Sequence, residues 1–267
     1  MKANYGIIIP AHDSYEDVVR VYYNSLCKFG GDLSGQVVWS NNLSKSKFDR
    51  METLNNSLDS SFCERILSAI EYLQTEYVIL QVEDYIYSSI LDENDLKNII
   101  QIMQEHSIRY CKLNKLETLH GWKKIKKYNS LFLSKRKTPY ALSINCGIFE
   151  SDYLKELIKD PSWTGWELEN YFLKLTDNGV ADKCLYSDDD IFHVKHLIVK
   201  GKIVPKTYRE LKKSNICLDT LNREFMSYGE VLKFDIISYF GDRASGKTRT
   251  ILKKIASRLG VHTVTEN

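Results

Sequence analysis

The sequence predicts an α/β fold in which a mostly parallel central sheet is flanked by helices. Short apolar runs rich in β-branched residues alternate along the chain with longer segments whose apolar residues recur at helical spacing. The order strand, helix, strand, helix requires right-handed crossovers between parallel strands. Ligands of such sheets bind at the carboxyl ends of the strands, so polar residues at those ends are the first candidates for a functional site.

Composition agrees with this fold class. Of the 267 residues, 43% are hydrophobic and 27% are charged, which excludes a disordered, collagen-like or coiled-coil chain. We expect residues 1–206 to form the main domain and residues 207–267 a mainly helical extension that packs on it or follows it. The 37 basic and 35 acidic residues nearly cancel, so attraction to nucleic acid or to an anionic membrane requires a local cluster of charge.

The chain carries no pattern typical of export or of a disulfide framework. Its longest apolar runs are far shorter than the ~18 residues that span a bilayer, and its N-terminus lacks a basic start followed by an apolar run. Six cysteines are scattered singly, without a CxxC pair, which argues against a zinc site and against structural disulfides. We therefore expect a cytoplasmic protein whose thiols mostly fill the core.

The first half of the chain supplies the clearest strands and helices. Residues 5–10 form an apolar run that ends in proline, as a buried parallel strand would. Ser14 and Asp17 resemble a capping box and predict a helix that continues to Gly30. Residues 36–40 predict the second strand.

The same reasoning continues through the next units. Ser61 and Glu64 form a second capping-box pattern before an apolar helix. A third strand is predicted over residues 77–82, a helix over 92–106 and a fourth strand over 108–113. The elements expected farther along are a strand at 141–145, helices at 150–159 and 165–175, strands near 182–186 and 191–199, and either helix or strand at 232–240.

Four features now occur in a specific order. They are Ile9-Pro10-Ala11-His12 at the end of the first strand, Arg65 on the helix before the third strand, Glu83-Asp84 at the end of that strand, and Gly165-Trp166-Glu167-Leu168-Glu169 downstream. Together they resemble the GT-A-type glycosyltransferases, in particular those of bacterial surface-polysaccharide (capsule and lipopolysaccharide O-antigen) biosynthesis. The later motif of that group, an apolar strand, Tyr-Leu on a helix and Trp-Glu-x-Glu, reads here as residues 143–149, Tyr153-Leu154 and residues 166–169.

The resemblance covers about residues 4–205 and implies both fold and activity. The implied fold is GT-A-like (Rossmann-like), and the implied reaction moves a sugar from a nucleotide-sugar donor to a glycan or lipid-linked saccharide acceptor. A second hypothesis keeps the fold without catalysis, as a sugar-nucleotide or glycan-binding protein that has lost its metal pair.

A metal site is implied because the donor leaves as a diphosphate, whose growing charge Mn²⁺ or Mg²⁺ can neutralise. The resemblance assigns Asp84 as the main ligand, with Glu83 sharing the role. Relatives usually carry Asp-x-Asp or Asp-Asp here, whereas this chain has Glu83-Asp84, so dependence on a metal is left open. A solvated turn at the end of a strand is the alternative for this acidic pair.

His193 is the further metal candidate, because some GT-A enzymes draw a ligand or a phosphate contact from this late region. His193 and His196 are three residues apart and would face opposite sides of a strand. The alternative is one partly buried and one solvated histidine without a shared role. Residues 188–190, Asp-Asp-Asp, are interpreted as a solvated turn.

A general base must take the proton from the acceptor hydroxyl, and a carboxylate within hydrogen-bond reach can do so. Glu169 and Glu167 are two residues apart on a helix and cannot face the same way. The resemblance favours Glu169, with Trp166 as an apolar wall against a sugar ring, and implies inversion at the anomeric carbon. The alternative is an ordinary helix start, in which glutamate favours the dipole and the tryptophans pack.

The nucleotide is assigned to the ends of the first two strands. By resemblance, Ala11, His12, Asp13, Asn41 and Asn42 lie where the group holds the base and ribose. Arg65 lies where related enzymes often have an arginine near the nucleotide, and a surface salt bridge is its alternative.

The C-terminal region contains a competing motif. Residues 241–248 fit GxxxxGK[ST], with an apolar run at 236–240 before them and a helical pattern at 250–259 after them. Only nineteen residues follow Thr248, too few for the remaining strands of a nucleoside triphosphatase. A phosphate-loop nucleotide-binding module is therefore the less favoured function, and a glycine-containing link into a basic terminal helix is the alternative.

A basic, aromatic stretch separates the two halves of the main domain. Trp122, Tyr128 and Phe132 interleave with one acid, Glu117, and with nine basic residues: Lys112, Lys115, Lys123, Lys124, Lys126, Lys127, Lys135, Arg136 and Lys137. Such a patch suits anionic lipid headgroups or the diphosphate of a lipid-linked acceptor, which places peripheral contact at the inner face of the membrane among the hypotheses. A solvated loop near the acceptor is the alternative, and we expect no nucleic-acid partner.

Overall fold

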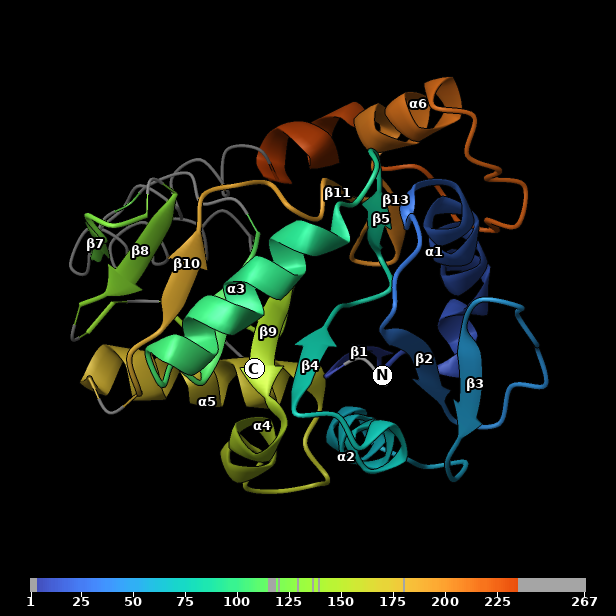
Figure 1. Cartoon of the computed structure of the whole chain (residues 1–267). Coiled ribbons are helices and arrows are strands. Elements are labelled where there is room, and N and C mark those ends of the chain that lie inside the picture. The colour runs from blue at the N-terminus through green and yellow to red at the C-terminus, as the bar shows by residue number, and fades with distance from the viewer. Residues whose placement is uncertain are drawn as a thin grey trace, which may run out of the picture.

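The chain folds around one nine-stranded sheet that lies between two layers of helices (Figure 1). The structure is a computed structural model that describes residues 4–114, 119, 121–128, 130–135, 137–138, 140–179 and 181–234. Across the sheet the strands follow the order β3-β2-β1-β4-β9-β6-β10-β8-β7. Their bounds are β1 Tyr5–Ile9, β2 Gln36–Asn41, β3 Glu52–Asn55, β4 Tyr77–Leu80, β6 Tyr110–Lys112, β7 Trp122–Lys124, β8 Leu131–Ser134, β9 Gly147–Glu150 and β10 Leu185–Ser187.

The sheet is mostly parallel, as the sequence predicts. Strands β3, β2, β1 and β4 pair in parallel, and so do β6 and β10. Only β9 and β8 run against the other described strands, because β9 inserts between β4 and β6, and β8 between β10 and β7. The carboxyl ends of β1, β2, β4, β6 and β10 therefore meet at one edge of the sheet.

Helices cover both faces of the sheet. Their bounds are α1 Glu16–Phe29, α2 Phe62–Leu73, α3 Glu93–Glu105, α4 Ser151–Leu157, α5 Gly165–Asn178 and α6 Pro205–Lys213. Helices α1 and α3 pack on one face, where Ile7 and Ile9 of β1 point, and α2, α4 and α5 pack on the other, where Ile8 points. Because both faces are buried, the central strands read as continuous apolar runs rather than alternating ones.

A smaller layer lies beyond the carboxyl edge. Strand β5 (Tyr85–Tyr87) pairs antiparallel with β11 (Val194–His196), and β12 (Ile198–Val199) pairs with β13 (Lys202–Ile203). Figure 1 draws α6 and the last described helical segment, residues 228–234, above β11 and β13.

The described part of the extension packs on the main domain through α1. Arg223 donates to both carboxylate oxygens of Asp17 at 2.8 Å, and the Thr220 hydroxyl donates to the carbonyl of Asp17. Residues 232–234 are helical rather than a strand, and residues 235–240 lie outside the described residues, as do the 241–248 motif and the 250–259 helix.

The predicted cap at Ser14 is wrong. Helix α1 begins at Glu16, after the 3-10 helix Asp13–Tyr15, and no side chain caps it. The physical reason is that Asp17 is held by Arg223, a residue 206 positions away, and therefore does not close a local capping box. By contrast, the Ser61–Glu64 capping box of α2 is confirmed, with both reciprocal hydrogen bonds present.

The predicted strand at 141–145 is also wrong, because that strand begins only at Gly147. Residues 141–146 instead form a loop along the carboxyl edge of the sheet. Tyr140 and Cys146, at its two ends, have φ angles of 56° and 46°. These left-handed conformations cannot continue a strand, and they are uncommon for residues other than glycine.

Two further expectations concern the core and the membrane. Cys63, Cys111, Cys146 and Cys184 are buried and Cys27 and Cys217 are exposed, which confirms that most thiols fill the core. Among the residues that the structure describes, no helix combines the length and the apolar character needed to cross a bilayer.

Candidate active site

Asp84 follows β4 at the carboxyl edge of the sheet, and its carboxylate faces His196. Its Oδ2 lies 3.0 Å from Nε2 of His196, because the antiparallel pairing of β5 with β11 sets His196 opposite Tyr85. The imidazole also stacks on the Tyr85 ring, with centroids 4.6 Å apart and planes 13° apart. This pairing holds both the position and the orientation of the histidine ring.

The second oxygen of Asp84 is available to a ligand. Oδ1 is buried and makes no hydrogen bond within the described part of the chain. An unpartnered buried carboxylate oxygen is costly, so it marks a place where a cation or a donor group would stabilise the folded protein.

His193 lies elsewhere, which corrects the choice between the two histidines. The amide of Ser88 donates to the His193 carbonyl, so His193 stands four residues beyond Asp84 along the ladder, roughly 13 Å at ~3.3 Å per residue. Its Nδ1 is 3.4 Å from Oδ2 of Asp190. The pairing of β5 with β11 places His196, rather than His193, beside Asp84. The spacing of the two histidines in the sequence does not predict which of them lies there.

Glu83 is held in an unusual state. Burial and the neighbouring charge of Asp84 raise the pKa of Glu83 to about 8, although Arg65 and Arg223 oppose the rise. Burial and the Asp84 charge thus favour the protonated form of Glu83, and a cation bound beside it would favour loss of that proton.

Arg65 forms hydrogen bonds to the segments that follow β1 and β2. Its guanidinium donates to Asn42 Oδ1 at 3.0 Å, to the Ser60 carbonyl at 2.6 Å and to the Pro10 carbonyl at 3.3 Å. It is only 7% exposed, so the alternative of a surface salt bridge is wrong. Burial lowers the pKa of Arg65, while the charges of Glu83 and Asp13 act in the opposite direction.

The other residues predicted at the nucleotide also meet at this edge. Asp13 accepts from the amides of Asn42 and Leu43 at 2.9 and 2.8 Å. Asn41 and Asn42 are buried, and Asn41 Oδ1 accepts from the amide of Ser44 at 2.9 Å. These asparagines therefore shape the loop after β2 instead of presenting free amides.

Ala11 and His12 complete the end of β1. The Ala11 carbonyl accepts from the indole of Trp39 at 3.0 Å, and Ala11 itself is buried. The side chain of His12 is exposed, and its Nδ1 accepts from the amide of Ser14. Among these residues, His12 thus has the most accessible side chain.

The structure separates the two candidate bases on α5. Glu167 closes the capping box of that helix, where its Oε2 accepts from the Thr164 amide at 2.7 Å, and it is exposed. Glu169 turns toward the sheet, where its Oε2 accepts from the Ile144 amide at 2.9 Å in the loop before β9. Trp166 is 62% exposed and so does not pack in the core.

Two influences oppose each other at Glu169, because burial favours its neutral form whereas its polar and charged neighbours favour the ionised form. Burial raises the pKa of Glu169, and the Ile144 amide, the charge of Lys112 and the Ser143 hydroxyl oppose that rise without cancelling it. A carboxylate with a raised pKa is a stronger base once ionised, which suits proton abstraction near neutral pH.

Tyr85 is influenced by the carboxylates of both Asp84 and Glu169. Burial raises the pKa of its phenol, and the charges of Asp84, Cys146 and Glu169 raise it further. Tyr85 therefore lies within electrostatic reach of both carboxylates. The Asp84–His196 pair and Glu169 thus both lie at the carboxyl edge of the sheet.

The site offers few protein ligands for a metal. Within the ranges that the structure describes, no group of three or more histidine, cysteine, aspartate or glutamate side chains converges as a metal site. The donor set at Asp84 still fits a cation of the Mg²⁺ or Mn²⁺ kind, because Mg²⁺ is usually held by one or two carboxylates together with substrate phosphates.

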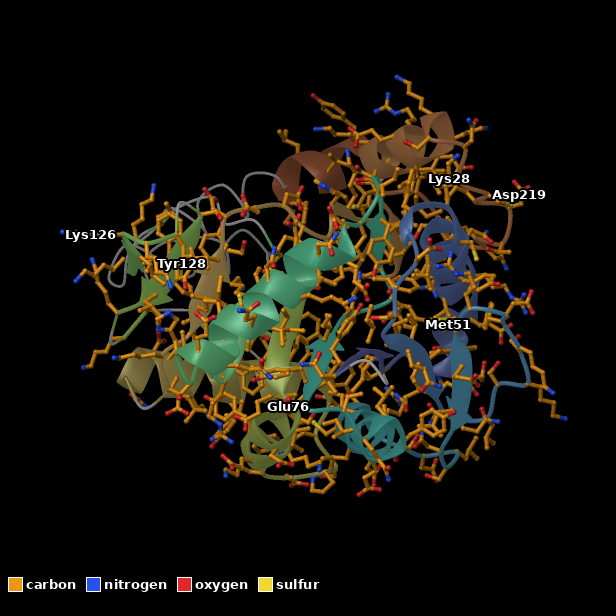
Figure 2. All side chains as sticks on the ribbon, viewed as in Figure 1. Lys28, Met51, Glu76, Lys126, Tyr128 and Asp219 are labelled. Atoms are coloured by element: carbon orange, nitrogen blue, oxygen red, sulfur yellow. The ribbon has the colours of Figure 1, made fainter. Side chains whose placement is uncertain are left out.

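The basic stretch divides into a buried and an exposed part. Lys112 ends β6 and is 4% exposed, and Trp122 and Phe132 pack against Tyr186 in the core. The exposed members form an edge hairpin, at whose outer side Figure 2 shows Lys126: they are Lys123, Lys124, Lys126, Lys127, Lys135 and Lys137. Lys115, Glu117 and Arg136 lie outside the described residues.

Comparison with known proteins bears on the fold. No protein-family model and no curated protein matches the chain. The structure of S. aureus TarS 1-349 in complex with UDP aligns with a TM-score of 0.51 at 15% identity, over 98% of this chain and 76% of that one. A longer TarS structure aligns with a TM-score of 0.50 at 15% identity, over 97% of this chain and 46% of its own length.

Two other solved structures align at lower scores. The mannosyltransferase PcManGT from Pyrobaculum calidifontis, in complex with GDP-Man and Mn²⁺, has a TM-score of 0.49 at 9% identity, over 98% of this chain and 82% of its own. A cytidylyltransferase from Leptospira borgpetersenii has a TM-score of 0.45 at 12% identity, over 91% and 98%. The likeness to TarS, with the sheet order and the two helical layers, confirms the GT-A-like α/β fold.

Proposed function

We propose that this protein is a nucleotide-sugar-dependent glycosyltransferase that acts on a glycan or lipid-linked saccharide in surface-polysaccharide biosynthesis. The observation that supports it most directly is that the Asp84–His196 pair and Glu169 lie at the same edge of the sheet, where both carboxylates raise the pKa of Tyr85. These groups stand at the carboxyl edge, where α/β sheets bind their ligands. The fold is shared with TarS, one structure of which is in complex with UDP, and this supports a nucleotide ligand.

On the donor side, Asp84 Oδ1 and the neighbouring His196 are the groups that would hold a divalent cation, with Glu83 joining them when it loses its proton. The cation, when bound, supplies positive charge against the leaving diphosphate. Arg65 and Asp13 do not need to touch the donor. They order the loops after β1 and β2, which form the wall on which the base and ribose would lie.

On the acceptor side, Glu169 accepts the proton of the attacking hydroxyl. A bond forms between the acceptor oxygen and the anomeric carbon while the bond from that carbon to the diphosphate oxygen breaks. The electron pair of the broken bond leaves with the diphosphate. Attack from the face opposite the leaving group inverts the anomeric carbon, and the Ile144 amide holds the Glu169 carboxylate in place for this step.

The exposed lysines of the β7–β8 hairpin support a partner that carries negative charge, either a lipid headgroup or the diphosphate of a lipid-linked acceptor. Trp122 and Phe132 of this stretch pack in the core and Tyr128 is half-buried, so such contact would depend on charge rather than on insertion of aromatic side chains into the bilayer. Co-sedimentation with anionic vesicles should fall steeply as salt rises, and should fall further when Lys123, Lys124, Lys126 and Lys127 are changed to Gln. Equal binding to neutral vesicles would contradict this part of the proposal.

A thermal-shift screen tests the donor class. UDP, GDP, CMP, TDP, ADP and ATP are each added with and without Mn²⁺ or Mg²⁺, because a ligand of the folded state raises Tm by mass action. We expect one non-adenine nucleotide to stabilise the protein, more strongly with metal, and the metal-dependent part to disappear in Asp84→Asn.

Two outcomes would favour the other functions. Stabilisation by adenine nucleotides alone, abolished by Lys247→Ala, would indicate the phosphate-loop module. Binding of a sugar nucleotide that Asp84→Asn leaves intact, without hydrolysis or transfer in the wild type, would indicate a non-catalytic binding protein.

A further inference from the structure

We propose that Lys112 is a positioning residue of this site, whose buried ammonium group faces Glu169 and keeps that carboxylate in its charged, proton-accepting form. The inference rests on the proposed function, because it gives Glu169 the role of base. In the sequence Lys112 is one member of the basic stretch, and only the fold separates it from the exposed lysines.

The strand register sets the direction of the Lys112 side chain. In β6, Cys111 packs in the core beneath α1 and α3, and Tyr110 packs in the core beneath α2, α4 and α5. Side chains alternate along a strand, so Lys112 points to the same face as Tyr110. Its neighbour on β10, Tyr186, lies on that face too. This is the face on which α5 carries Glu169.

Burial makes an acidic neighbour necessary. Lys112 is 4% exposed at the carboxyl end of a central strand. A lysine that leaves water is costly unless an anion compensates its charge, and Glu169 is the carboxylate that α5 brings to this face. The Ile144 amide fixes Glu169 at this end of the sheet, and the adjacent Ser143 carbonyl accepts from the Tyr110 hydroxyl.

The groups that face Glu169 come from three elements. Lys112 and Tyr110 come from β6, Tyr85 from β5, and Ser143 with the Ile144 amide from the loop before β9. Lys112 is the cation among them, and its charge lowers the pKa of Glu169 against the effect of burial, as it also does for the thiols of Cys146 and Cys184. Without this charge, only the hydrogen bonds from Ile144 and Ser143 would counter the rise that burial causes in the pKa of Glu169.

The matched variants are Lys112→Met, which keeps the length without the charge, and Lys112→Arg, which keeps the charge. The rate is measured as kcat/KM across the acid limb of the pH profile. We expect Lys112→Met to shift the acid limb to higher pH by about one pH unit or more, with kcat/KM recovering at high pH. Lys112→Arg, which keeps the charge, should show the wild-type profile. Lys112→Gln is the second uncharged variant should the methionine disturb folding, and Tm reports folding for each.

A measurement independent of turnover separates this inference from the proposed function. The pKa of Glu169 is followed by NMR of labelled side-chain carboxyls, with Glu169→Gln to assign the signal. A raised pKa in Lys112→Met supports the pairing even if the wild type transfers no sugar, and in that case the role of base falls with the proposed function. An unchanged Glu169 pKa, or a rate that falls equally at every pH, would overturn the inference.

Discussion

Nε2 of His196 lies 3.0 Å from Oδ2 of Asp84, although 112 residues separate them in the chain. The contact leaves Oδ1 of Asp84 buried and unpartnered within the described residues. One oxygen of this carboxylate thus contacts a histidine, while the other stands where a cation or a donor group would stabilise the folded protein. This division supports the proposed cation site, although Glu83-Asp84 replaces the Asp-x-Asp or Asp-Asp expected at the end of this strand.

Asp84→Asn and His196→Gln are expected to lower turnover at least ~100-fold, because both weaken the site that faces the leaving diphosphate. His193→Gln is the matched control, since His193 is three residues away in sequence but pairs with Asp190. Steady-state transfer assays at saturating donor and metal check this, with Tm to confirm folding. Full activity in His196→Gln together with loss in His193→Gln would reverse our assignment.

Glu169→Gln should lower kcat by ~100-fold or more without unfolding the protein, because the amide cannot accept the proton. Glu167→Gln should change the rate little and the free energy of unfolding by less than about 0.5 kcal/mol, because glutamine also closes a capping box. The two variants remove the same charge from the same helix two residues apart. Equal losses of rate in both would mean that net charge, rather than position, matters.

Arg65→Met is expected to lower the free energy of unfolding by about 3 kcal/mol, because it removes the guanidinium donor from three buried acceptors, on Asn42, Ser60 and Pro10. The Ser60 carbonyl keeps a hydrogen bond from Asn42 Nδ2 at 3.3 Å. Arg50→Met is the control, as Arg50 is exposed and donates to the carbonyls of Gly31 and Cys27. Urea denaturation of both variants measures the difference. A change below about 1 kcal/mol for Arg65→Met would contradict a bracing role for this arginine.

Lowering the pH should remove the stability that the ionised Glu93 side chain contributes to the folded state. Burial acts to raise the pKa of Glu93, but hydrogen bonds from Lys97, Ser34 and Tyr5 outweigh it and lower the pKa from 4.5 to about 2. The folded state therefore binds this proton more weakly than the unfolded state, so the contribution is complete above about pH 5 and lost as the pH falls toward 2.

Glu93→Gln checks this by urea denaturation at several pH values. The difference in unfolding free energy between the variant and the wild type should shrink as the pH falls through this window. Glu105→Gln is the control, because Glu105 is exposed and accepts a hydrogen bond from Gln101 on the same helix. A difference that stays constant with pH would show that folding does not change the pKa of Glu93.

Local sequence patterns were enough to predict many of the helices and strands. The apolar run of β1, the capping box of α2 and the periodicity of α3 each depend on residues within one or two turns of each other, so sequence alone predicts them. The carboxyl ends of β1, β2 and β4 followed from the order of these elements. Strands β3 and β5 were missed, because their short segments acquire strand geometry only by pairing with β2 and β11.

The sequence by itself determined that polar residues gather at one edge of a mostly parallel sheet, and that Glu167 and Glu169 face different ways on their helix. Only the tertiary structure decided that His196 rather than His193 meets Asp84, that Arg65 is buried, and that the buried Lys112 lies on the sheet face that α5 covers. The physical reason is the distance along the chain over which each interaction acts. Helix period and strand alternation act over a few residues, whereas each of these relationships depends on how segments distant in the chain pair or pack.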